Sequence, residues 1–250
     1  REKEKEIKTI DWDLGKIQKG KYRHFMLKEI FEQPEAIVNS LRGRVNLKEG
    51  KIKLEGLEGA LKKLKKLKKI FIVGCGSAFH AGLFGKYLIE EKTDLSAEVE
   101  IASEFRYRKH PFSKDAAFLV ISQSGETADS LAALRLAKEK KILSLGIVNV
   151  VGSTIARETD FGIYNHIGPE IGVASSKAFS SQLAILVLFS LFLAQERNLI
   201  SSKEEKLIIR SLLKIPQQIR KILQQANLYK KIAKKYLRYQ NFFYLGRKFN

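Results

Sequence analysis

The stretch SQSGETADS, residues 122–130, gathers polar side chains at a single turn of the chain. It follows the apolar run AAFLVI and precedes LAALRLAKEKK, so it joins a predicted buried strand to a predicted helix. The first turn of a helix offers unpaired N–H groups and the positive end of the helix dipole, and both attract anions. Gly125 lets the backbone wrap closely around such an anion. The candidate phosphate-binding residues are Ser122, Gln123, Ser124 and Thr127.

The same turn also fits a plainer interpretation, in which one hydroxyl caps the helix. Ser124 and Thr127 are both good N-cap residues, and Glu126 suits the first turn of a helix. A cap accounts for one hydroxyl, but it does not account for three hydroxyls and a glutamine together. The spacing alone leaves the phosphate site and the helix cap both open.

A second candidate turn, GCGSAF, follows the apolar run IFIV. Its glycines, Gly74 and Gly76, allow a tight turn and a close approach of the backbone to a ligand. Both turns follow predicted parallel strands, whose carboxyl ends form the edge at which α/β sheets bind ligands. The sequence has no G-x-x-x-x-G-K-[ST] motif, and no G-x-G-x-x-G motif follows this strand. These absences argue against ATP and dinucleotide sites.

Short apolar runs alternate with helical patterns through the middle of the chain. The predicted strands cover residues 70–74, 97–102, 116–122, 142–150 and 161–167. The predicted helices between and after them cover residues 78–91, 127–141, 153–158 and 177–197. This alternation implies right-handed βαβ units, and continuously apolar strands imply burial on both faces. We therefore predict an α/β fold, a five-stranded parallel sheet with helices on both faces in a flavodoxin-like three-layer sandwich.

The flanking segments also predict helices. Residues 51–69, which include LKKLKKLKK, place leucines at helical spacing and predict an amphipathic helix with a solvated lysine face. Pro34 is expected to end the helix that carries Met26 and Ile30. Pro216 is expected to begin the second helix of the basic C-terminal tail.

The composition is that of a folded and strongly basic protein. Of 250 residues, 44% are hydrophobic, which is enough for a core, and 46 basic against 27 acidic residues give a net charge of +19. Such a charge suits nucleic acids, anionic membranes or small anions. Because LKKLKKLKK lacks interleaved aromatic residues, we expect no nucleic-acid partner. The longest apolar run, residues 183–194, suits a core helix, so we expect no membrane partner.

Four motifs carry a resemblance to a known family. SQSGETADSLAALR, IASEFRYRK, EIGVASSKAF and FMLKEIFEQP resemble the isomerase part of the glutamine–fructose-6-phosphate aminotransferases, from about residue 22 to residue 247. SQSGET alone is typical of any sugar-isomerase (SIS) domain, whereas the last two motifs narrow the resemblance to the aminotransferases. The resemblance implies a first SIS domain in the middle of the chain.

The resemblance also implies domain boundaries. The expected parts are the end of a glutaminase domain and a linker (1–20), an N-terminal helical segment (21–50), the first SIS domain (51–198), a helical linker (199–240) and the beginning of a second SIS domain (241–250). We expect a short strand in IKTIDWDL and the first strand of the second domain in NFFYLGRKFN. Because the chain starts with Arg1, we expect it to be a piece of a longer protein.

Site residues carry over from the family where they match its motifs. The resemblance assigns Ser122, Gln123, Ser124 and Thr127 to the phosphate, Cys75, Gly76 and Ser77 to a turn facing the sugar, and Val173 and Ser175 to a loop touching the sugar. Ala78 stands where the family usually has a serine, so the hydroxyl that could contact the sugar or the phosphate there is missing. No catalytic residue is assigned, because Glu170 is expected to be structural and Lys177 to lie on a helix surface or form a salt bridge. The four histidines show no metal-ligand spacing, so we expect neither a metal nor a cofactor.

The family's reaction forms glucosamine 6-phosphate from fructose 6-phosphate and glutamine. The resemblance implies that the parent protein is this enzyme and that the present segment binds fructose 6-phosphate or glucosamine 6-phosphate. The segment alone is expected to be inactive, because the family's proton-transferring residues come later in the chain. A cytoplasmic homodimer is expected. The alternative is a regulatory SIS module that binds a phosphosugar without chemistry, but EIGVAS argues against it.

Overall fold

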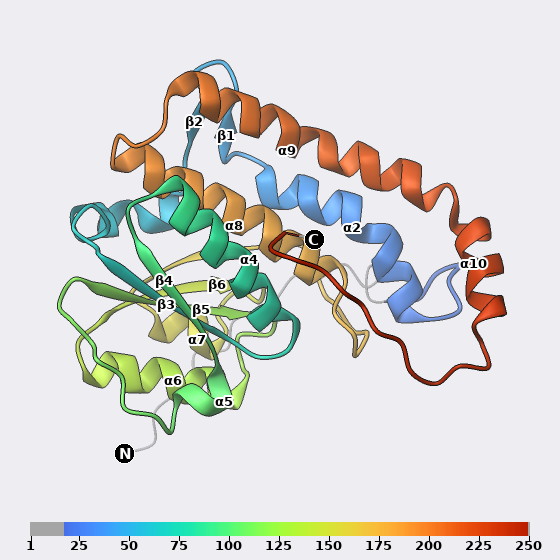
Figure 1. Cartoon of the computed structure of the whole chain (residues 1–250), viewed down its shortest axis with the longest axis horizontal. Helices are drawn as coiled ribbons and strands as arrows, with labels where there is room; N and C mark the ends of the chain where they lie inside the picture. The colour runs from blue at the N-terminus through green and yellow to red at the C-terminus, as the bar shows by residue number, and fades with distance from the viewer. Residues whose placement is uncertain (1–17, 250) are drawn as a thin grey trace.

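The structure, a computed structural model, describes residues 18–249. Five parallel strands form one sheet in the order β4-β3-β5-β6-β7 (Figure 1). The strands are β3 (Lys69–Gly74), β4 (Ser96–Ile101), β5 (Ala116–Ser122), β6 (Leu143–Val148) and β7 (Phe161–Tyr164). The predicted five-stranded parallel sheet is confirmed, and AAFLVIS is its middle strand. The strand expected in IKTIDWDL lies outside the described residues.

Both faces of the sheet are covered by helices, which explains why its strands are apolar throughout. On β5, Leu119 and Ile121 belong to the hydrophobic cluster that includes residues of the helices α4 (Ser77–Lys92) and α8 (Lys177–Glu196). Phe118 and Val120, which alternate with them, belong to the cluster that includes residues of the helices α5 (Ala102–Phe105), α6 (Ala128–Glu139) and α7 (Thr154–Glu158). Successive side chains of a strand point to opposite faces, so two buried faces require an unbroken apolar run.

The helices form the two outer layers of the sandwich (Figure 1). They are α4 (Ser77–Lys92), α5 (Ala102–Phe105), α6 (Ala128–Glu139), α7 (Thr154–Glu158) and α8 (Lys177–Glu196). Among the described residues, α8 is the one helix whose length and composition would allow it to cross a membrane, but 72% of its most apolar window is buried inside the protein. The expectation of a core helix is therefore confirmed.

Two proline expectations are wrong. Pro34 lies inside α2 (Phe25–Leu41) and does not end it. A proline cannot bond the carbonyl four residues back, but the side-chain amide of Gln33 donates to that carbonyl, on Ile30, at 3.1 Å. Pro216 likewise lies buried inside α9 (Ser202–Leu223).

The predicted amphipathic helix over residues 51–69 is also wrong in form. The segment consists of the short strand β2 (Lys51–Ile52), the 3₁₀-helix η1 (Glu55–Ala60) and one turn of helix, α3 (Leu61–Leu64). A further short strand, β1 (Val45–Asn46), pairs antiparallel with β2. Gly56 approaches β7 so closely that a Cβ there would lie 2.0 Å from the carbonyl oxygen of Gly162. The segment is nevertheless amphipathic as expected, because its leucines are largely buried and its lysines face the solvent.

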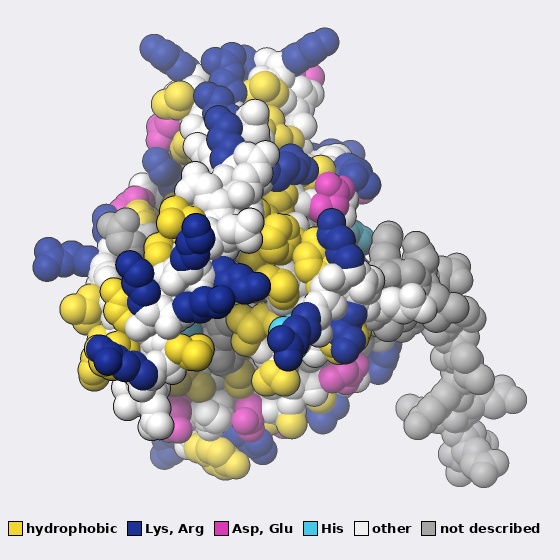
Figure 2. All heavy atoms as spheres, turned by 90° about the vertical axis from the view of Figure 1, so that its right-hand side faces the viewer, with side chains coloured by type: hydrophobic (Ala, Val, Ile, Leu, Met, Phe, Trp, Pro, Cys, Tyr) yellow, Lys and Arg dark blue, Asp and Glu magenta, His cyan; other side chains and the backbone are white. Residues whose placement is uncertain are grey.

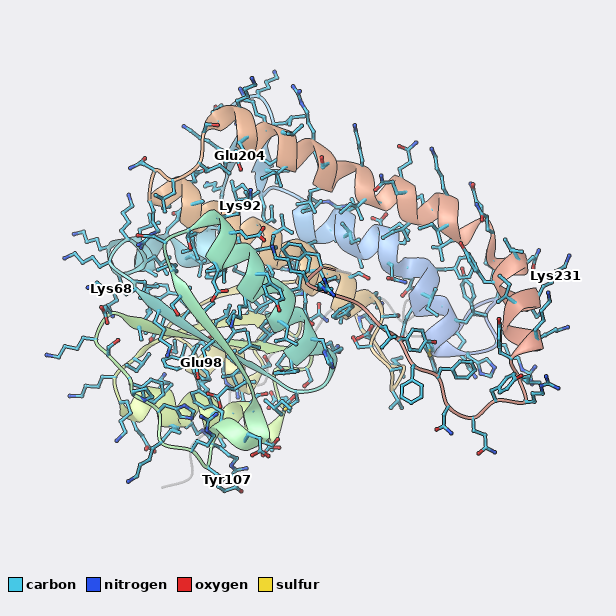
Figure 3. The ribbon with its side chains drawn as sticks, in the orientation of Figure 1. Lys68, Lys92, Glu98, Tyr107, Glu204 and Lys231 are labelled. Carbon is cyan, nitrogen blue, oxygen red and sulfur yellow. The ribbon has the colours of Figure 1, made fainter. Side chains whose placement is uncertain are left out.

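The C-terminal part leaves the sandwich as a helical arm. Helix α9 runs beside α2, and α10 (Ala226–Lys235) follows it (Figure 1). The ammonium of Lys92 on α4 lies 2.8 Å from the carboxylate of Glu204, which ties the beginning of α9 to the domain (Figure 3).

The strand expected in NFFYLGRKFN is not present, because residues 241–249 contain no strand. A strand needs a neighbour to pair with, and no described strand pairs with this segment. The arm and the tail instead leave large hydrophobic side chains exposed. Figure 2 shows hydrophobic side chains between lysines and arginines at this end of the molecule. The most exposed of them are Leu237, Phe243, Tyr244 and Leu245.

Candidate functional site

The candidate residues meet in a hollow of about 170 Å³ at the carboxyl edge of the sheet. All of the predicted site residues except Gly76 line it. The predicted residues that it brings together are Cys75, Ser77, Ser122, Gln123, Ser124, Thr127, Val173 and Ser175. Gly76 is exposed and occupies the N-cap position of α4 with a φ of +56°.

Three helices begin at the hollow, and this arrangement favours an anion. Ser77 is the first residue of α4, Thr127 is the N-cap of α6, and Ser175 lies just before α8. The N-termini of α4 and α6, which have no side-chain cap, present unpaired N–H groups and a partial positive charge, whereas a carboxylate bonds to the N–H groups at the start of α8. The parallel sheet produces this convergence, because every helix that follows a parallel strand begins at the same edge.

The hydroxyls of the SQSGET turn hold its backbone in place. Ser122 Oγ accepts a hydrogen bond from the Gly125 N–H at 3.0 Å, and Ser124 Oγ accepts one from the Glu126 N–H at 3.2 Å. A hydroxyl that accepts a bond can still donate its own proton. Both serines can therefore pass a hydrogen bond from the backbone to a ligand oxygen.

The helix-cap interpretation fails for Thr127. This residue occupies the N-cap position of α6, but its side chain makes no capping hydrogen bond. Its hydroxyl instead lies 3.3 Å from the hydroxyl of Ser122. Ser124 does not cap the helix either, because its partner Glu126 precedes the N-cap. Capping of α6 therefore does not explain why the hydroxyls of Ser122, Ser124 and Thr127 lie together.

Gly125 is required at its position for two separate reasons. Its φ of +68° lies in the left-handed region, which disfavours any side chain. A Cβ at this position would also lie 2.0 Å from Ser153 Oγ. The Gly125 carbonyl accepts a hydrogen bond from the Ile155 N–H at 2.9 Å, so the turn is fastened to α7.

Glu170 has the structural role that the sequence analysis expected. Its carboxylate accepts hydrogen bonds from the Ser176 N–H at 3.0 Å and the Ala178 N–H at 3.1 Å. It also accepts one from the Ser175 hydroxyl at 3.0 Å. The carboxylate therefore caps α8 and neutralises the positive end of that helix.

Glu29, on α2, holds the loop that carries Val173, a role that no local sequence pattern revealed. Its buried carboxylate accepts hydrogen bonds from the Ile171 N–H at 2.6 Å and the Gly172 N–H at 3.0 Å. One feature of the sequence could have indicated this contact, namely that two family motifs occur together. FMLKEIFEQP contains Glu29, and EIGVASSKAF contains the loop. The two motifs are in contact with each other in the structure.

A second contact between these two motifs confirms the salt-bridge role of Lys177 and excludes a helix-surface role. Its ammonium lies 2.7 Å from the carboxylate of Glu32, and only 5% of the Lys177 side chain is exposed. A buried lysine already paired with a carboxylate is a structural ion pair rather than a free nucleophile.

The hollow itself offers little acid–base chemistry. Its only titratable lining side chains are Cys75 and Glu170, and no histidine or lysine lines it. The thiol of Cys75 lies 3.8 Å from the hydroxyl of Ser130. Among residues 18–249, no group of three or more His, Cys, Asp or Glu side chains could hold a metal ion. The arrangement is suited to binding and orienting a polar anion.

Comparison with known families identifies the fold. The family model of the SIS domain matches residues 63–191, which lie within the predicted range of 51–198. The chain belongs to the SIS domain family. This SIS domain chain is similar over its whole length to a glutamine–fructose-6-phosphate aminotransferase of Chlorobaculum tepidum, at 51% identity. It is 40% identical to a human aminotransferase of the same name over 98% of the chain.

These curated relatives are longer than the SIS domain chain. The chain spans 40% of the Chlorobaculum tepidum protein and 36% of the human protein. The similarity therefore concerns one part of the aminotransferases, as the four sequence motifs predicted, and the predicted resemblance is confirmed.

Solved structures also show the similarity to the aminotransferases and to the fold of the SIS domain. The C-terminal domain of glucosamine-fructose-6-phosphate aminotransferase from Francisella tularensis superimposes with a TM-score of 0.82 and 38% identity, over 88% of this chain and 61% of that one. A glucosamine-6-phosphate deaminase from Thermotoga maritima superimposes with a TM-score of 0.59 over 78% of this chain and 54% of that one. Its identity of 21% supports a shared fold only.

Proposed function

We propose that this chain is the part of a glutamine–fructose-6-phosphate aminotransferase that holds the sugar phosphate. The observation that carries the proposal is the convergence of the SQSGET turn, the GCGSAF turn and the loop of EIGVASSKAF on one hollow. The 51% identity to an aminotransferase over the whole chain favours this enzyme over a regulatory SIS module.

The phosphate takes the end of the hollow beside α6. The hydroxyls of Ser122, Ser124 and Thr127 gather there, and the N-terminus of α6 adds its dipole. At the α8 end, the helix dipole is already neutralised by Glu170, whose carboxylate repels a phosphate. The sugar therefore extends from the phosphate toward Val173 and Ser175.

The chemistry itself belongs to the whole aminotransferase. Moving a proton between sugar carbons needs a positioned acid or base, and the only carboxylate lining this hollow is engaged in capping α8. The chain contributes binding energy and orientation to the formation of glucosamine 6-phosphate from fructose 6-phosphate and glutamine. A cytoplasmic homodimer stays a prediction.

Calorimetry with fructose 6-phosphate and with fructose tests the proposed binding. Fructose 6-phosphate should bind, whereas fructose should not, because the anchoring phosphate is missing. A hydrogen bond to a charged oxygen contributes about 1.5–3 kcal/mol, so Ser124→Ala should weaken binding roughly ten- to a hundredfold. Ser211→Ala, which removes an exposed hydroxyl on α9, is the matched control and should leave affinity unchanged. Equal binding of both sugars, or unchanged affinity in Ser124→Ala, would contradict the proposal.

An activity assay tests the absence of catalytic groups. The purified chain should form no glucosamine 6-phosphate from fructose 6-phosphate and ammonia, measured by chromatography of the products. Turnover that disappears in Glu170→Gln or Lys177→Met would show that this chain carries catalytic groups after all.

A further inference from the structure

Gln182, in the second turn of α8, has a side-chain amide whose hydrogen-bonding capacity is not used. The residue lines the hollow and is only 2% exposed. Its side-chain oxygen is buried and accepts no hydrogen bond from any described residue. Buried polar groups in folded proteins are almost always hydrogen-bonded, because an unpaired one destabilises the fold.

Neighbouring buried polar groups and the other unpaired atoms show that the unpaired amide of Gln182 is specific to the hollow. Ser181, the preceding residue on α8, is fully engaged, since its hydroxyl lies 2.6 Å from Ser40 Oγ and 2.7 Å from Asn165 Nδ2. The described part of the chain contains a few other buried side-chain atoms without a partner, but of their residues only Gln182 lines the hollow. The missing partner of Gln182 is thus placed at the ligand site.

The chemistry of the missing partner follows from what surrounds it. Ala78 lines the same hollow and supplies no polar atom, and Glu170, also in the lining, disfavours an anion at this end. A neutral group that can both donate and accept hydrogen bonds fits an amide, and a hydroxyl is such a group. A hydroxyl can donate to the amide oxygen or accept from the amide nitrogen, so the fit holds for either orientation of the amide.

We infer that Gln182 binds a hydroxyl of the sugar and thereby selects the sugar part of the ligand, whereas the SQSGET turn selects the phosphate. This inference rests on the proposed function, because it assumes that a sugar phosphate occupies the hollow. The terminal torsion of a glutamine side chain is broad, so the amide can turn toward a bound ligand without leaving its rotamer. A ligand without a hydroxyl at this place leaves the amide unpaired and is rejected.

The test is an NMR titration of the chain with fructose 6-phosphate and, separately, with inorganic phosphate. Gln182→Met keeps the size of the side chain and removes the amide. It should weaken fructose 6-phosphate binding about tenfold and change phosphate binding less than twofold. The melting temperature should not fall, because no internal hydrogen bond is lost. Gln195→Met is the matched control on the same helix, since its amide bonds to the backbone of Ile52 at 2.9 Å. It should lower the melting temperature and leave both affinities unchanged.

The outcomes separate this inference from the proposed function. Equal affinity of the wild type and Gln182→Met for fructose 6-phosphate overturns the role of Gln182 and leaves the phosphate site intact. A fall in the melting temperature together with weaker binding of both ligands makes Gln182 a structural residue and also overturns the inference. If the wild-type chain binds neither ligand, the proposed function fails, and the inference fails with it.

Discussion

The two edges of the sheet differ in a way that bears on function. The carboxyl edge carries the small hollow, with hydroxyls and amides from the SQSGET turn and two neighbouring segments. The amino edge, where β3, β5 and β6 begin, carries a hollow of about 670 Å³ with one acidic residue, Asp115. The lysines that line this larger hollow are Lys62, Lys63, Lys66, Lys114 and Lys141. The larger and more strongly charged hollow is therefore not the one that gathers the predicted ligand residues.

The two hollows differ in how firmly their hydrogen-bond donors are held, and not only in size and charge. Lysine ammonium groups are strongly hydrated and sit on flexible side chains, so they hold no particular geometry. The carboxyl edge holds its donors rigidly, because helix N-termini and hydrogen-bonded hydroxyls fix them at known places.

The largest effect is expected for Gly125→Ala. A left-handed conformation costs an alanine about 1–2 kcal/mol, and the new methyl group would also meet the buried Ser153 hydroxyl. The variant should lose about 3 kcal/mol of unfolding free energy, measured by urea denaturation, and should bind fructose 6-phosphate weakly.

Two control variants separate the strain at Gly125 from the clash. Gly152 has a similar φ of +72° but open space around it, so Gly152→Ala should lose only about 1 kcal/mol. Adding Ser153→Ala to Gly125→Ala removes the clashing oxygen and should restore part of the stability. A loss of stability in Gly152→Ala as large as in Gly125→Ala would contradict the role of the clash.

A smaller effect is expected for Glu29→Ala, which releases the loop of the carboxyl edge. Two backbone N–H groups lose a charged acceptor, so the free energy of unfolding should fall by about 2 kcal/mol. Fructose 6-phosphate affinity should fall as well, because the loop carries Val173 and Ser175. The matched control on α2 is Glu35→Ala, which removes an exposed carboxylate and should cost less than about 0.5 kcal/mol. Equal stability of the two variants would show that Glu29 does not hold the loop.

Most of the sheet could be predicted from sequence, because buried parallel strands are short apolar runs bounded by turns. The strand AAFLVIS was placed to the residue. The errors fell where tertiary contacts override local preference. Pro34 stays inside α2 because a neighbouring side chain satisfies the carbonyl it leaves unpaired, and no local pattern reveals such a bond. The tail 241–249 has strand-like composition but no described strand to pair with.

Local patterns predicted only the two turns of the candidate site, and the loop with Val173 and Ser175 was predicted through the family resemblance. The SQSGET and GCGSAF turns are continuous, and the pattern of strand followed by helix gives their position. Glu29 supports the loop from more than a hundred residues away, so its role depends on how α2 docks. Gln182 lies within an apolar helix, and its unpaired amide is visible only once burial is known.

Thr127→Ala sharpens the contrast between a ligand site and a helix cap. Because the Thr127 side chain does not cap α6, its loss should change the unfolding free energy by only a few tenths of a kcal/mol. Fructose 6-phosphate affinity should fall about tenfold, because one donor to the phosphate is removed. Denaturation and calorimetry on the same variant measure both. A loss of about 1 kcal/mol in stability with unchanged affinity would restore the cap interpretation.

The smallest effect on sugar-phosphate binding is expected at the amino edge. Six-residue strands separate the two edges by about 20 Å, more than twice the Debye length of about 8 Å at physiological salt. Replacing Lys62, Lys63 and Lys66 together by glutamine should therefore change fructose 6-phosphate affinity less than about twofold at a physiological ionic strength of about 0.15 M. Binding to generic DNA, measured over a range of salt concentrations, should be weak in the wild type and weaker in the variant, because only diffuse phosphate contacts are available. A fivefold loss of fructose 6-phosphate affinity in the triple variant would break the contrast, since it would show that charge at the far edge contributes to the site.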